Sequence, residues 1–539
     1  MLRETSHWAA DTSTPILEST VGSVLRDAAE AAPHQLAVIA YGSDIHGRRT
    51  WTFAELLRDA ERTARAMLRH FEPGEHIAVW ANNVPEWLLL EFGAALARLV
   101  LVTVNPALGA REVEYVLRQS GSVGLFHVRG FRGNPLAGIA DQIRPQLPQL
   151  RKTIEIERLE EFLATGSEDV VLPHVSPDDP AQIQYTSGTT GFPKGATLLH
   201  RAITNNARLA FAGYGVSQPT AYAHGMPFFH TAGCVLATLG PLQARVPQVF
   251  SEAFDPGLLL AMAERERASH LTGVPTMLIA MLQHPSFAAR DLSSVRVVPT
   301  GGSMVPPELV RAIETRIGAK VSIVFGQTEA SPMITQVPPD ASERDKARTV
   351  GLPLPQIEVK IIDPATGAIV PVGVVGEFCA RGYVVMRGYH GMPGPTAEAI
   401  DAEGWLHTGD LATMDARGYC CIAGRLKDMV IRGGENLFPA EIEAILHEHP
   451  AIVEAAVVGV PDPFMGEELA AFIRAEKGWS PNEAELRSHV RARLAAHKAP
   501  RYWIAVDEFP LTGSGKIQKF LLRERWEKEA GQPEPRDVG

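Results

Sequence analysis

Cysteine is scarce in this chain, and its placement excludes two kinds of site at once. The 539 residues contain four cysteines, Cys234, Cys379, Cys420 and Cys421. Their spacing in the sequence gives neither a paired metal knuckle nor a redox CxxC motif. The adjacent Cys420 and Cys421 would face opposite sides of a strand. We expect all four to be small buried or half-buried apolar residues, in a reducing, cytoplasmic setting.

Long hydrophobic runs are also lacking. The first residues, MLRETSHW, contain no apolar stretch of the kind found in signal peptides, so no signal peptide is predicted. The most apolar segment, residues 87–104, is interrupted by Glu91 and Arg98 and is soon followed by Pro106. This pattern predicts a buried helix that leads into a buried strand rather than a membrane span.

An excess of positive charge is the third absence. Lysine and arginine number 51 against 62 aspartates and glutamates, which gives a formal net charge of -11. An acidic surface repels phosphate backbones and therefore disfavours a nucleic-acid or anionic-membrane partner. With 45% hydrophobic and 21% charged residues, the composition is that of an ordinary soluble globular protein. The length exceeds what one core supports, so at least two domains are expected.

Helical and strand patterns alternate along the first half of the chain. Residues 52–71 carry an apolar stripe with helical spacing, and Thr52 and Glu55 have the spacing of a capping box at its start. Strand, helix, strand patterns follow at 76–81, 86–99 and 101–104, and again at 295–298, 307–317 and 321–325. This alternation predicts an α/β fold with parallel-rich sheets covered by helices on both faces.

The texture of the sequence changes twice in the second half. From about Val350 glycine and proline become frequent, and short strand patterns such as 377–380 predict a small β-rich subdomain. Beyond Arg425 the patterns at 455–460, 469–473, 483–494 and 502–506 predict a compact α+β unit of about 110 residues.

The strongest local signal is a loop suited to polyphosphate. Residues 185–195 read YTSGTTGFPKG and follow a strand pattern at 181–185. Glycines let a backbone approach a ligand closely, and N–H groups, hydroxyls and one lysine are what a polyphosphate needs. The spacing differs from that of a Walker A loop, so the P-loop NTPase interpretation loses its main support. The residues predicted to bind nucleotide are Thr186, Ser187, Gly188, Thr189, Thr190, Gly191 and Lys194.

This segment resembles the signature loop of the adenylate-forming superfamily, which comprises acyl-CoA synthetases, luciferases and nonribosomal peptide adenylation domains. In that family the loop grips the β- and γ-phosphates of ATP. Further motifs of the family stand in order over nearly the whole chain. The resemblance implies an N-terminal AMP-binding domain, 1–426, that holds the ATP and acyl sites. It also implies a small mobile C-terminal lid domain, 427–539.

Two motifs in the first of these domains would surround the adenylate. VFGQTEA, residues 324–330, resembles the Y-G-x-T-E segment, with Phe325 in place of the usual tyrosine. By resemblance Glu329 holds Mg2+, assisted by Thr189, since a hard cation prefers carboxylate and phosphate oxygens. TGGSM, residues 300–304, resembles the segment that flanks adenine and the acyl pocket. The predicted contacts are Gly301, Gly302, Ser303, Phe325, Gly326, Gln327 and Thr328.

The remaining motifs lie around the expected domain boundary and beyond it. GWLHTGD, residues 404–410, implies that Asp410 binds the ribose hydroxyls, and GRLKDMVIRGGENLFPAEIE, residues 424–443, implies that Arg425 does so too. Lys427 stands at the hinge position of the family. By resemblance Gly433, Gly434 and Glu435 line the pantetheine tunnel of coenzyme A, although an RGGEN segment alone is also typical of an ordinary hairpin. PLTGSGKIQK, residues 510–519, implies that Lys516 is the catalytic lysine.

PFFHTAG, residues 227–233, bears on the acid that is activated. Relatives that activate amino acids carry an aspartate where this chain has His230, so an amino acid is disfavoured. An aromatic residue followed by histidine is similar to acyl- and aryl-CoA synthetases, and we assign His230 to the substrate site. The segment from Ile431 to Arg523 looks most like medium-chain fatty acyl-CoA synthetases, so the preferred acid is a medium-chain or similar apolar one.

The sequence leaves several alternatives open. A stand-alone adenylating enzyme could use an aromatic or unusual acid and pass it to a carrier protein or an amine. A luciferase-like oxidation and a homodimer are also compatible with the motifs. A catalytically dead binding protein is disfavoured, because Glu329, Asp410, Arg425 and Lys516 are all present.

Overall fold

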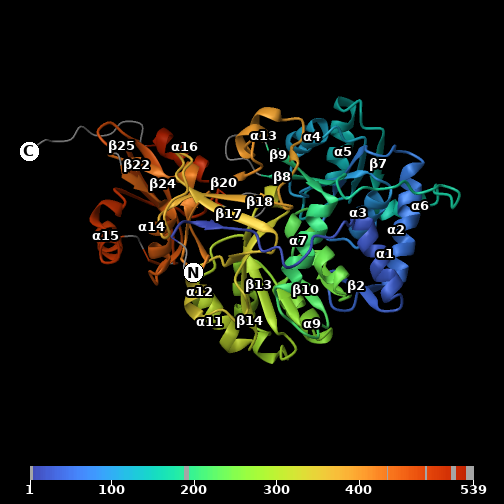
Figure 1. Ribbon diagram of the computed structural model, residues 1–539, viewed down its shortest axis with the longest axis horizontal. Helices are drawn as coiled ribbons and strands as arrows, with labels where there is room; N and C mark the ends of the chain where they lie inside the picture. The colour runs from blue at the N-terminus through green and yellow to red at the C-terminus, as the bar shows by residue number, and fades with distance from the viewer. Residues whose placement is uncertain are drawn as a thin grey trace, which may run out of the picture.

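The computed structural model describes residues 4–186, 193–433, 435–476, 478–479, 482–510 and 517–529. Within these ranges the strands form four sheets. Two large sheets covered by helices make up the blue-to-yellow body of Figure 1, and an antiparallel sheet separates this body from an orange-red unit at one end. The predicted α/β class is confirmed.

The two large sheets are parallel at their centres, and they carry antiparallel strands at both edges of the nine-stranded sheet and at one edge of the seven-stranded sheet. The seven-stranded sheet has the order β19 (Gly388–Tyr389), β9 (Lys194–Leu199), β8 (Pro180–Thr186), β5 (Val100–Val104), β4 (His76–Trp80), β6 (Gly124–His127) and β7 (Lys152–Glu155). The nine-stranded sheet has the order β16 (Leu352–Pro353), β15 (Met333–Gln336), β14 (Lys320–Gly326), β13 (Val297–Gly301), β12 (His270–Thr272), β10 (Tyr222–His224), β11 (Gln248–Ser251), β2 (Leu36–Tyr41) and β3 (Arg48–Thr52).

The helices of the body alternate with these strands. They are α1 (Val21–Ala31), α2 (Phe53–Leu68), α3 (Glu86–Leu96), α4 (Ala110–Gln119), α5 (Leu136–Ile143), α6 (Leu159–Leu163), α7 (His200–Ala212), α8 (Thr238–Gln243), α9 (Pro256–Arg265), α10 (Pro275–Gln283), α11 (Pro307–Arg316), α12 (Glu343–Arg348) and α13 (Pro393–Ala399). Most strand pairs that a helix connects are parallel, as βαβ units require.

Helix α2 shows how the sequence specifies these elements. Its N-cap Thr52 accepts a hydrogen bond from the Glu55 N–H while the Glu55 side chain accepts one from the Thr52 N–H, so the predicted capping box is present. Its apolar stripe is buried against α3, which is itself buried on nearly every side. The predicted helix followed by a strand within residues 87–104 is confirmed as α3 and β5. No helix among the described residues is long and apolar enough to cross a membrane.

The third sheet is antiparallel throughout and corresponds to the β-rich region expected after Val350. Its order is β1 (His7–Trp8), β17 (Ile357–Ile362), β18 (Gly376–Gly382), β20 (Leu406–Met414) and β21 (Cys420–Arg425). Strand β1 comes from the start of the chain and was not predicted, since two residues carry no periodicity. In this sheet Cys379 and Cys420 are buried and Cys421 is half-buried, while Cys234 is buried in the body, as expected.

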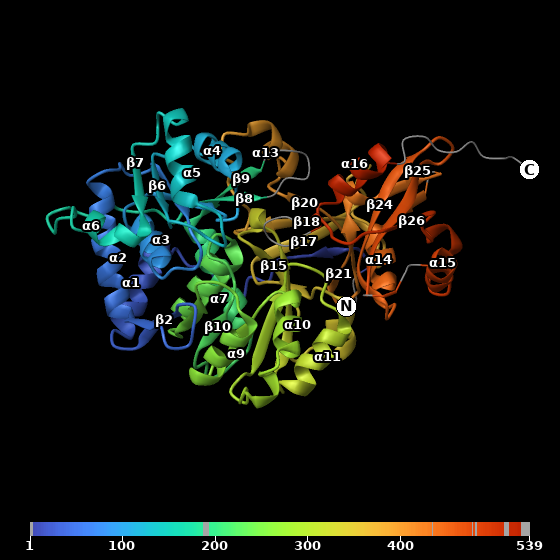
Figure 2. The same ribbon diagram turned by 180° about the vertical axis from the view of Figure 1, so that it is seen from behind.

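The orange-red unit takes its strands only from the chain after β21. Its sheet contains β23 (Glu435–Leu437), β22 (Val430–Arg432), β25 (Gly466–Ala475) and β24 (Ile452–Asp462), with β26 (Tyr502–Ala505) pairing with β25. Its helices are α14 (Pro439–His447), α15 (Glu483–Arg491) and α16 (Lys519–Glu529). Both views place this unit beside the antiparallel sheet (Figure 2). Helix α14 faces β21 there, because a Cβ at Gly424 would lie 3.9 Å from the Cβ atoms of Phe438 and Ala440.

Candidate active site

The predicted phosphate loop connects two antiparallel strands. Thr186 at the end of β8 pairs with Lys194 at the start of β9, so the two strands form a hairpin whose described ends meet at these residues. The loop predictions for Ser187, Gly188, Thr189, Thr190 and Gly191 lie outside the described residues. The hairpin brings both of its described ends to one edge of the seven-stranded sheet.

One tyrosine links this hairpin to the predicted metal ligand. The Tyr389 hydroxyl donates a hydrogen bond of 2.8 Å to Glu329 Oε1, and Lys194 Nζ lies 4.9 Å from the centroid of the Tyr389 ring. Strand β19 holds Tyr389 in register against Ala196 of β9. Lys194 and Glu329 therefore both contact the side chain of Tyr389, although they are far apart in the sequence.

A backbone hydrogen bond and the protonation state of Tyr389 both stabilise the contact between Tyr389 and Glu329. The Met386 N–H donates to the Glu329 carbonyl at 2.9 Å, which anchors the 3-10 turn η5 (Thr328–Ala330) to the segment before β19. Burial raises the pKa of Tyr389, and the negative charge of Glu329 raises it further. The phenol therefore stays protonated and remains a hydrogen-bond donor to the carboxylate.

Glu329 fits the role of a ligand for a hard cation. It is half-buried, and of its two carboxylate oxygens only Oε1 is engaged by a hydrogen bond from the described residues. Its other oxygen can be shared with a metal ion whose remaining ligands are phosphate oxygens and water. A single protein carboxylate suffices for Mg2+, which binds phosphates and retains several waters.

The residues predicted around adenine lie at the carboxyl ends of two neighbouring parallel strands. Gly301 ends β13 and pairs with Val324 of β14, which ends at Gly326. A Cβ at Gly301 would collide with the Val324 carbonyl, and one at Gly326 would collide with the Pro332 carbonyl. Ligands of open α/β sheets bind at this end of the strands. The segments 302–303 and 327–328, which contain the other predicted contacts, follow directly.

Phe325 packs into the interior of the protein. Its ring is edge-on to Phe378, with 5.5 Å between the centroids, and it borders the core of the antiparallel sheet. The ring therefore helps to join β14 to β18, a contact that the motif did not predict.

Asp410 and Arg425 form the ion pair of the predicted ribose site. They are cross-strand partners on β20 and β21, with Asp410 Oδ1 at 3.2 Å from Arg425 Nε. The carboxylate is largely buried, whereas the guanidinium is half exposed. Lys427 follows on the turn η6 (Leu426–Asp428), between β21 and the strands of the C-terminal unit.

The predicted coenzyme A turn belongs to the C-terminal unit. Gly433 has φ +59 and follows Arg432, which pairs with Glu435 in the hairpin of β22 and β23. Glu435 Oε2 lies 3.3 Å from His497 Nε2. Gly434 and Lys516 lie outside the described residues. Within the described part of the chain, no hydrogen bond or ion pair joins this turn to Glu329 or Lys194.

His230 stands at the entrance to a distorted helix. Its side chain is exposed, its Nδ1 accepts the Ala232 N–H at 3.1 Å, and its carbonyl accepts the Gly233 N–H at 2.9 Å. The π-helix η3 (Ala232–Ala237) follows. Such segments are frequent at functional sites, and the assignment of His230 to the substrate site stays a prediction.

A separate hollow lies at the amino ends of the parallel strands of the nine-stranded sheet. It has a volume of about 560 Å³ and is lined in part by Arg267, Arg296 and Lys320. Two of its lining residues begin strands: Val297 begins β13 and Lys320 begins β14. The hollow is therefore a full strand length away from Gly301 and Gly326, at which these strands end. It is not part of the site described above.

Tyr389 gives the first prediction from this geometry. Replacing it with phenylalanine keeps the ring beside Lys194 but removes the bond to Glu329. A hydrogen bond to a charged group contributes about 1.5–3 kcal/mol, so kcat/KM for ATP should fall about 10- to 100-fold. Because the hydroxyl positions the carboxylate, the Mg2+ concentration needed for half-maximal rate should rise as well.

Tyr419→Phe is the matched control, since Tyr419 is a partly buried tyrosine on the distal turn of the antiparallel sheet. It should leave both quantities unchanged. Equal kinetics for the two variants would show that the Tyr389 hydroxyl does not position Glu329.

Comparisons with known proteins cover both parts of the chain. A family model described as "AMP-binding enzyme" matches residues 25–390, and one described as "AMP-binding enzyme C-terminal domain" matches residues 441–516. A protein of Bacillus subtilis (strain 168), YngI, whose name assigns it to the acyl-CoA synthetases, is 41% identical over 95% of this chain and 97% of its own length.

Two further relatives are similar over almost the same extent. The mitochondrial medium-chain acyl-CoA ligase ACSF2 of Rattus norvegicus is 36% identical over 97% of this chain and 90% of its own length. The crystal structure of ATP-bound MatB from Rhodopseudomonas palustris is similar, with a TM-score of 0.85 and 30% sequence identity. The match covers 96% of this chain and 100% of that chain.

Proposed function

The chain belongs to the family of AMP-binding enzymes, in its acyl-CoA synthetase branch, and from this premise we propose its substrate and its residue roles. The enzyme activates a medium-chain fatty acid, or a similar apolar acid, with ATP and Mg2+ and transfers the acyl group to coenzyme A. The observation that carries the proposal is the contact of Lys194 and Glu329 through Tyr389, which unites a phosphate-binding cation with a metal-binding carboxylate.

In the first half-reaction an oxygen of the substrate carboxylate attacks the α-phosphorus of ATP. The bond to the bridging oxygen breaks, and pyrophosphate leaves with the negative charge. Lys194 and the N–H groups of its loop stabilise that charge, and Lys516 aligns the carboxylate with the α-phosphate. Glu329 would hold Mg2+, which would supply charge neutralisation on the phosphate oxygens. Asp410 and Arg425 orient the ribose.

In the second half-reaction the thiolate of coenzyme A attacks the acyl carbon of the adenylate. The bond to the AMP phosphate oxygen breaks, and AMP leaves as the thioester forms. We place the domain boundary between residues 426 and 427, so that the C-terminal domain, 427–539, turns about Lys427. This rotation withdraws Lys516 and brings the turn at Gly433 and Glu435 to the adenylate.

The choice of acid rests on the medium-chain ligase relative and on the exposed His230 beside the π-helix. The test is release of pyrophosphate and AMP from ATP with acids from acetate to palmitate and with aryl acids, with and without coenzyme A. We expect turnover that depends on coenzyme A, with the highest kcat/KM for a medium-chain acid and an acyl-CoA product identified by mass.

The other outcomes test the choice of acid and the choice of acceptor separately. A best acid that is aromatic or short would refute the medium-chain assignment but keep the ligase. Pyrophosphate release that is indifferent to coenzyme A for every acid would refute coenzyme A as the acceptor and favour a carrier protein or an amine.

A further inference from the structure

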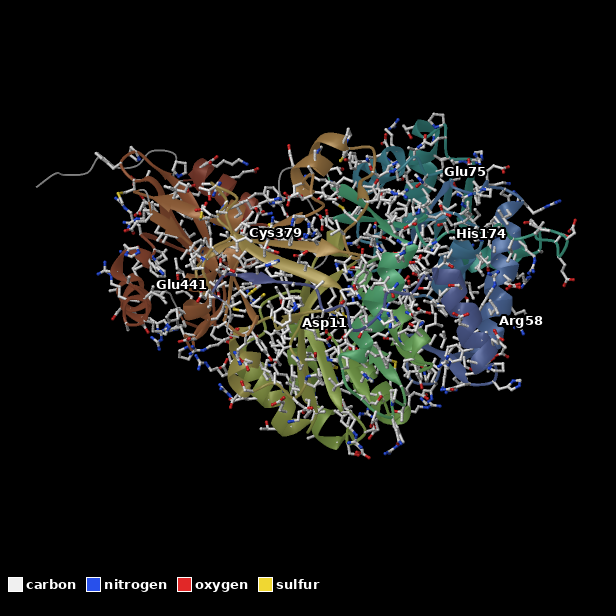
Figure 3. All side chains as sticks on the ribbon, in the orientation of Figure 1. Asp11, Arg58, Glu75, His174, Cys379 and Glu441 are labelled. Atoms are coloured by element: carbon white, nitrogen blue, oxygen red, sulfur yellow. The ribbon has the colours of Figure 1, made fainter. Side chains whose placement is uncertain are left out.

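Three side chains with metal-ligand chemistry meet on the antiparallel sheet, outside the candidate active site. Glu377 and Cys379 lie on β18, and His407 lies on the neighbouring β20. One ligand atom from each lies within 4.8 Å of those of the other two. Figure 3 labels Cys379, which lies at the middle of the molecule between the body and the C-terminal unit. The residues at 377 and 379 alternate along one strand and therefore project from the same face.

His407 is oriented as metal-binding histidines are. Its Nδ1 lies 2.9 Å from Glu377 Oε2 and 3.7 Å from Cys379 Sγ. Its other ring nitrogen, Nε2, lies 3.5 Å from Asp401 Oδ2. A ligating histidine almost always directs its second nitrogen to a carboxylate or carbonyl, which fixes the ring and its tautomer. Asp401 is itself held, since its Oδ1 accepts the N–H groups of Glu403 and Trp405 at 2.9 Å.

Two of the three ligand-atom separations are close to those of a tetrahedral site. Zinc bound to one sulfur at about 2.3 Å and to nitrogen and oxygen at about 2.0–2.1 Å separates its ligand atoms by about 3.3–3.7 Å. The Nδ1–Sγ distance already lies at this value, and the Nδ1–Oε2 distance is about 0.4 Å short of it. The third separation, between the Glu377 carboxylate oxygen and Cys379 Sγ, is at most 4.8 Å.

We propose that Glu377, Cys379 and His407 bind a single divalent transition-metal ion of the zinc class, which cross-links β18 to β20. The Cys379 thiol loses its proton to solvent as the Sγ–metal bond forms, and the neutral imidazole of His407 binds the metal with the lone pair of Nδ1. Three protein ligands leave a fourth position for water. The proposal goes beyond the proposed function and does not depend on it.

The charges around the cluster favour a dication. The Glu377 carboxylate and the thiolate would carry two negative charges, and Asp401 adds a third beyond the histidine. One cation, Lys360, is also close enough to act on Cys379, and its Nζ lies 4.2 Å from the centroid of the Trp405 ring. His407 is 27% exposed on its side chain, which gives an ion access from solvent.

The test uses the full chain, freed of metal with a chelator and titrated with Co2+ in the absence of nucleotide. We expect a thiolate-to-cobalt charge-transfer band in the near ultraviolet that saturates at one equivalent and is displaced by Zn2+. Cys379→Ser should abolish the band. Asp401→Asn, which weakens the support of His407, should lower the affinity about 10- to 100-fold. Zn2+ should raise the Tm of the wild type and leave that of Cys379→Ser unchanged.

Two controls isolate the cluster. Cys421→Ser removes a half-buried thiol of the same sheet, on β21, and should keep the band. Glu329→Gln removes the candidate magnesium ligand and should keep it too. His407→Gln retains every cysteine and should lose tight binding, which covers the case of a Cys379 variant that fails to fold. A wild type without the band, or equal affinity in His407→Gln, would overturn the proposal.

Discussion

Replacing Glu329 with glutamine is expected to slow adenylate formation about 10²–10³-fold, the usual effect of removing one preorganised electrostatic group from an active site. Glutamine has the same shape and can still accept the hydroxyl of Tyr389 through its amide oxygen. It lacks the negative charge that a hard cation requires. The loss should appear in acid-dependent exchange between pyrophosphate and ATP, together with a higher requirement for Mg2+.

The structure also says what this substitution should leave intact. Glu329 is half-buried, and its bond to Tyr389 survives in the variant, so the Tm should stay within about 2 °C of the wild type. Glu308→Gln is the matched control, because it removes an exposed carboxylate from α11 that pairs only with Arg311 among the described residues. Unchanged exchange and an unchanged Mg2+ requirement in Glu329→Gln would remove Glu329 from the metal site.

The elements that the sequence predicted best are those with a local cause. Helix α2 has both its cap and its apolar stripe in consecutive residues, and it begins at Phe53, directly after the predicted cap at Thr52. The predicted helix at 483–494 ends earlier, at Arg491, and its end was misplaced because no glycine or asparagine follows there to mark it. The antiparallel strands β9 and β19 were not predicted. Strand β19 has only two residues, which carry no periodicity, and its partner β9 is distant in the sequence.

The candidate site likewise contains residues that local motifs predicted and one residue that they did not. Motifs located Lys194, Glu329, Asp410 and Arg425, and the pairing of Asp410 with Arg425 follows from two motifs that fall on adjacent strands. Nothing marked Tyr389, because a single tyrosine in a glycine-rich segment has no periodic or motif signal. Its role arises only when β19 is added to the edge of the seven-stranded sheet beside the phosphate hairpin.

The cysteines show most clearly what sequence spacing cannot predict. Their sequence spacing correctly excluded a CxxC motif, and Cys379 is buried as expected. The sheet nevertheless places His407, from another strand, 3.7 Å from its sulfur. A ligand set assembled from one cysteine, one histidine and one glutamate on two strands has no fixed spacing, so sequence inspection cannot identify it.

Lys427→Pro is expected to separate the two half-reactions, sparing adenylate formation and slowing thioester formation about 10²-fold, the size of effect that misplacing a reacting group can have. Lys427 lies on η6, the turn through which the chain passes from β21 to β22. Proline fixes φ near −65° and removes a backbone donor, so it restricts the dihedral change that a hinge requires. The measurement is pyrophosphate exchange for the first step and conversion of supplied acyl-adenylate with coenzyme A for the second.

Lys427→Ala distinguishes the backbone from the charge, because it removes the ammonium and leaves φ free. It should retain thioester formation far better than the proline variant does. Lys516→Ala is expected to show the reverse selectivity, with adenylate formation lost about 10²–10³-fold and conversion of supplied acyl-adenylate preserved. If Lys427→Pro slowed both steps equally, the residue would be a structural support at the boundary rather than a hinge. If Lys516→Ala lost both steps, the C-terminal unit would serve the two reactions in one orientation, and rotation between them would be unnecessary.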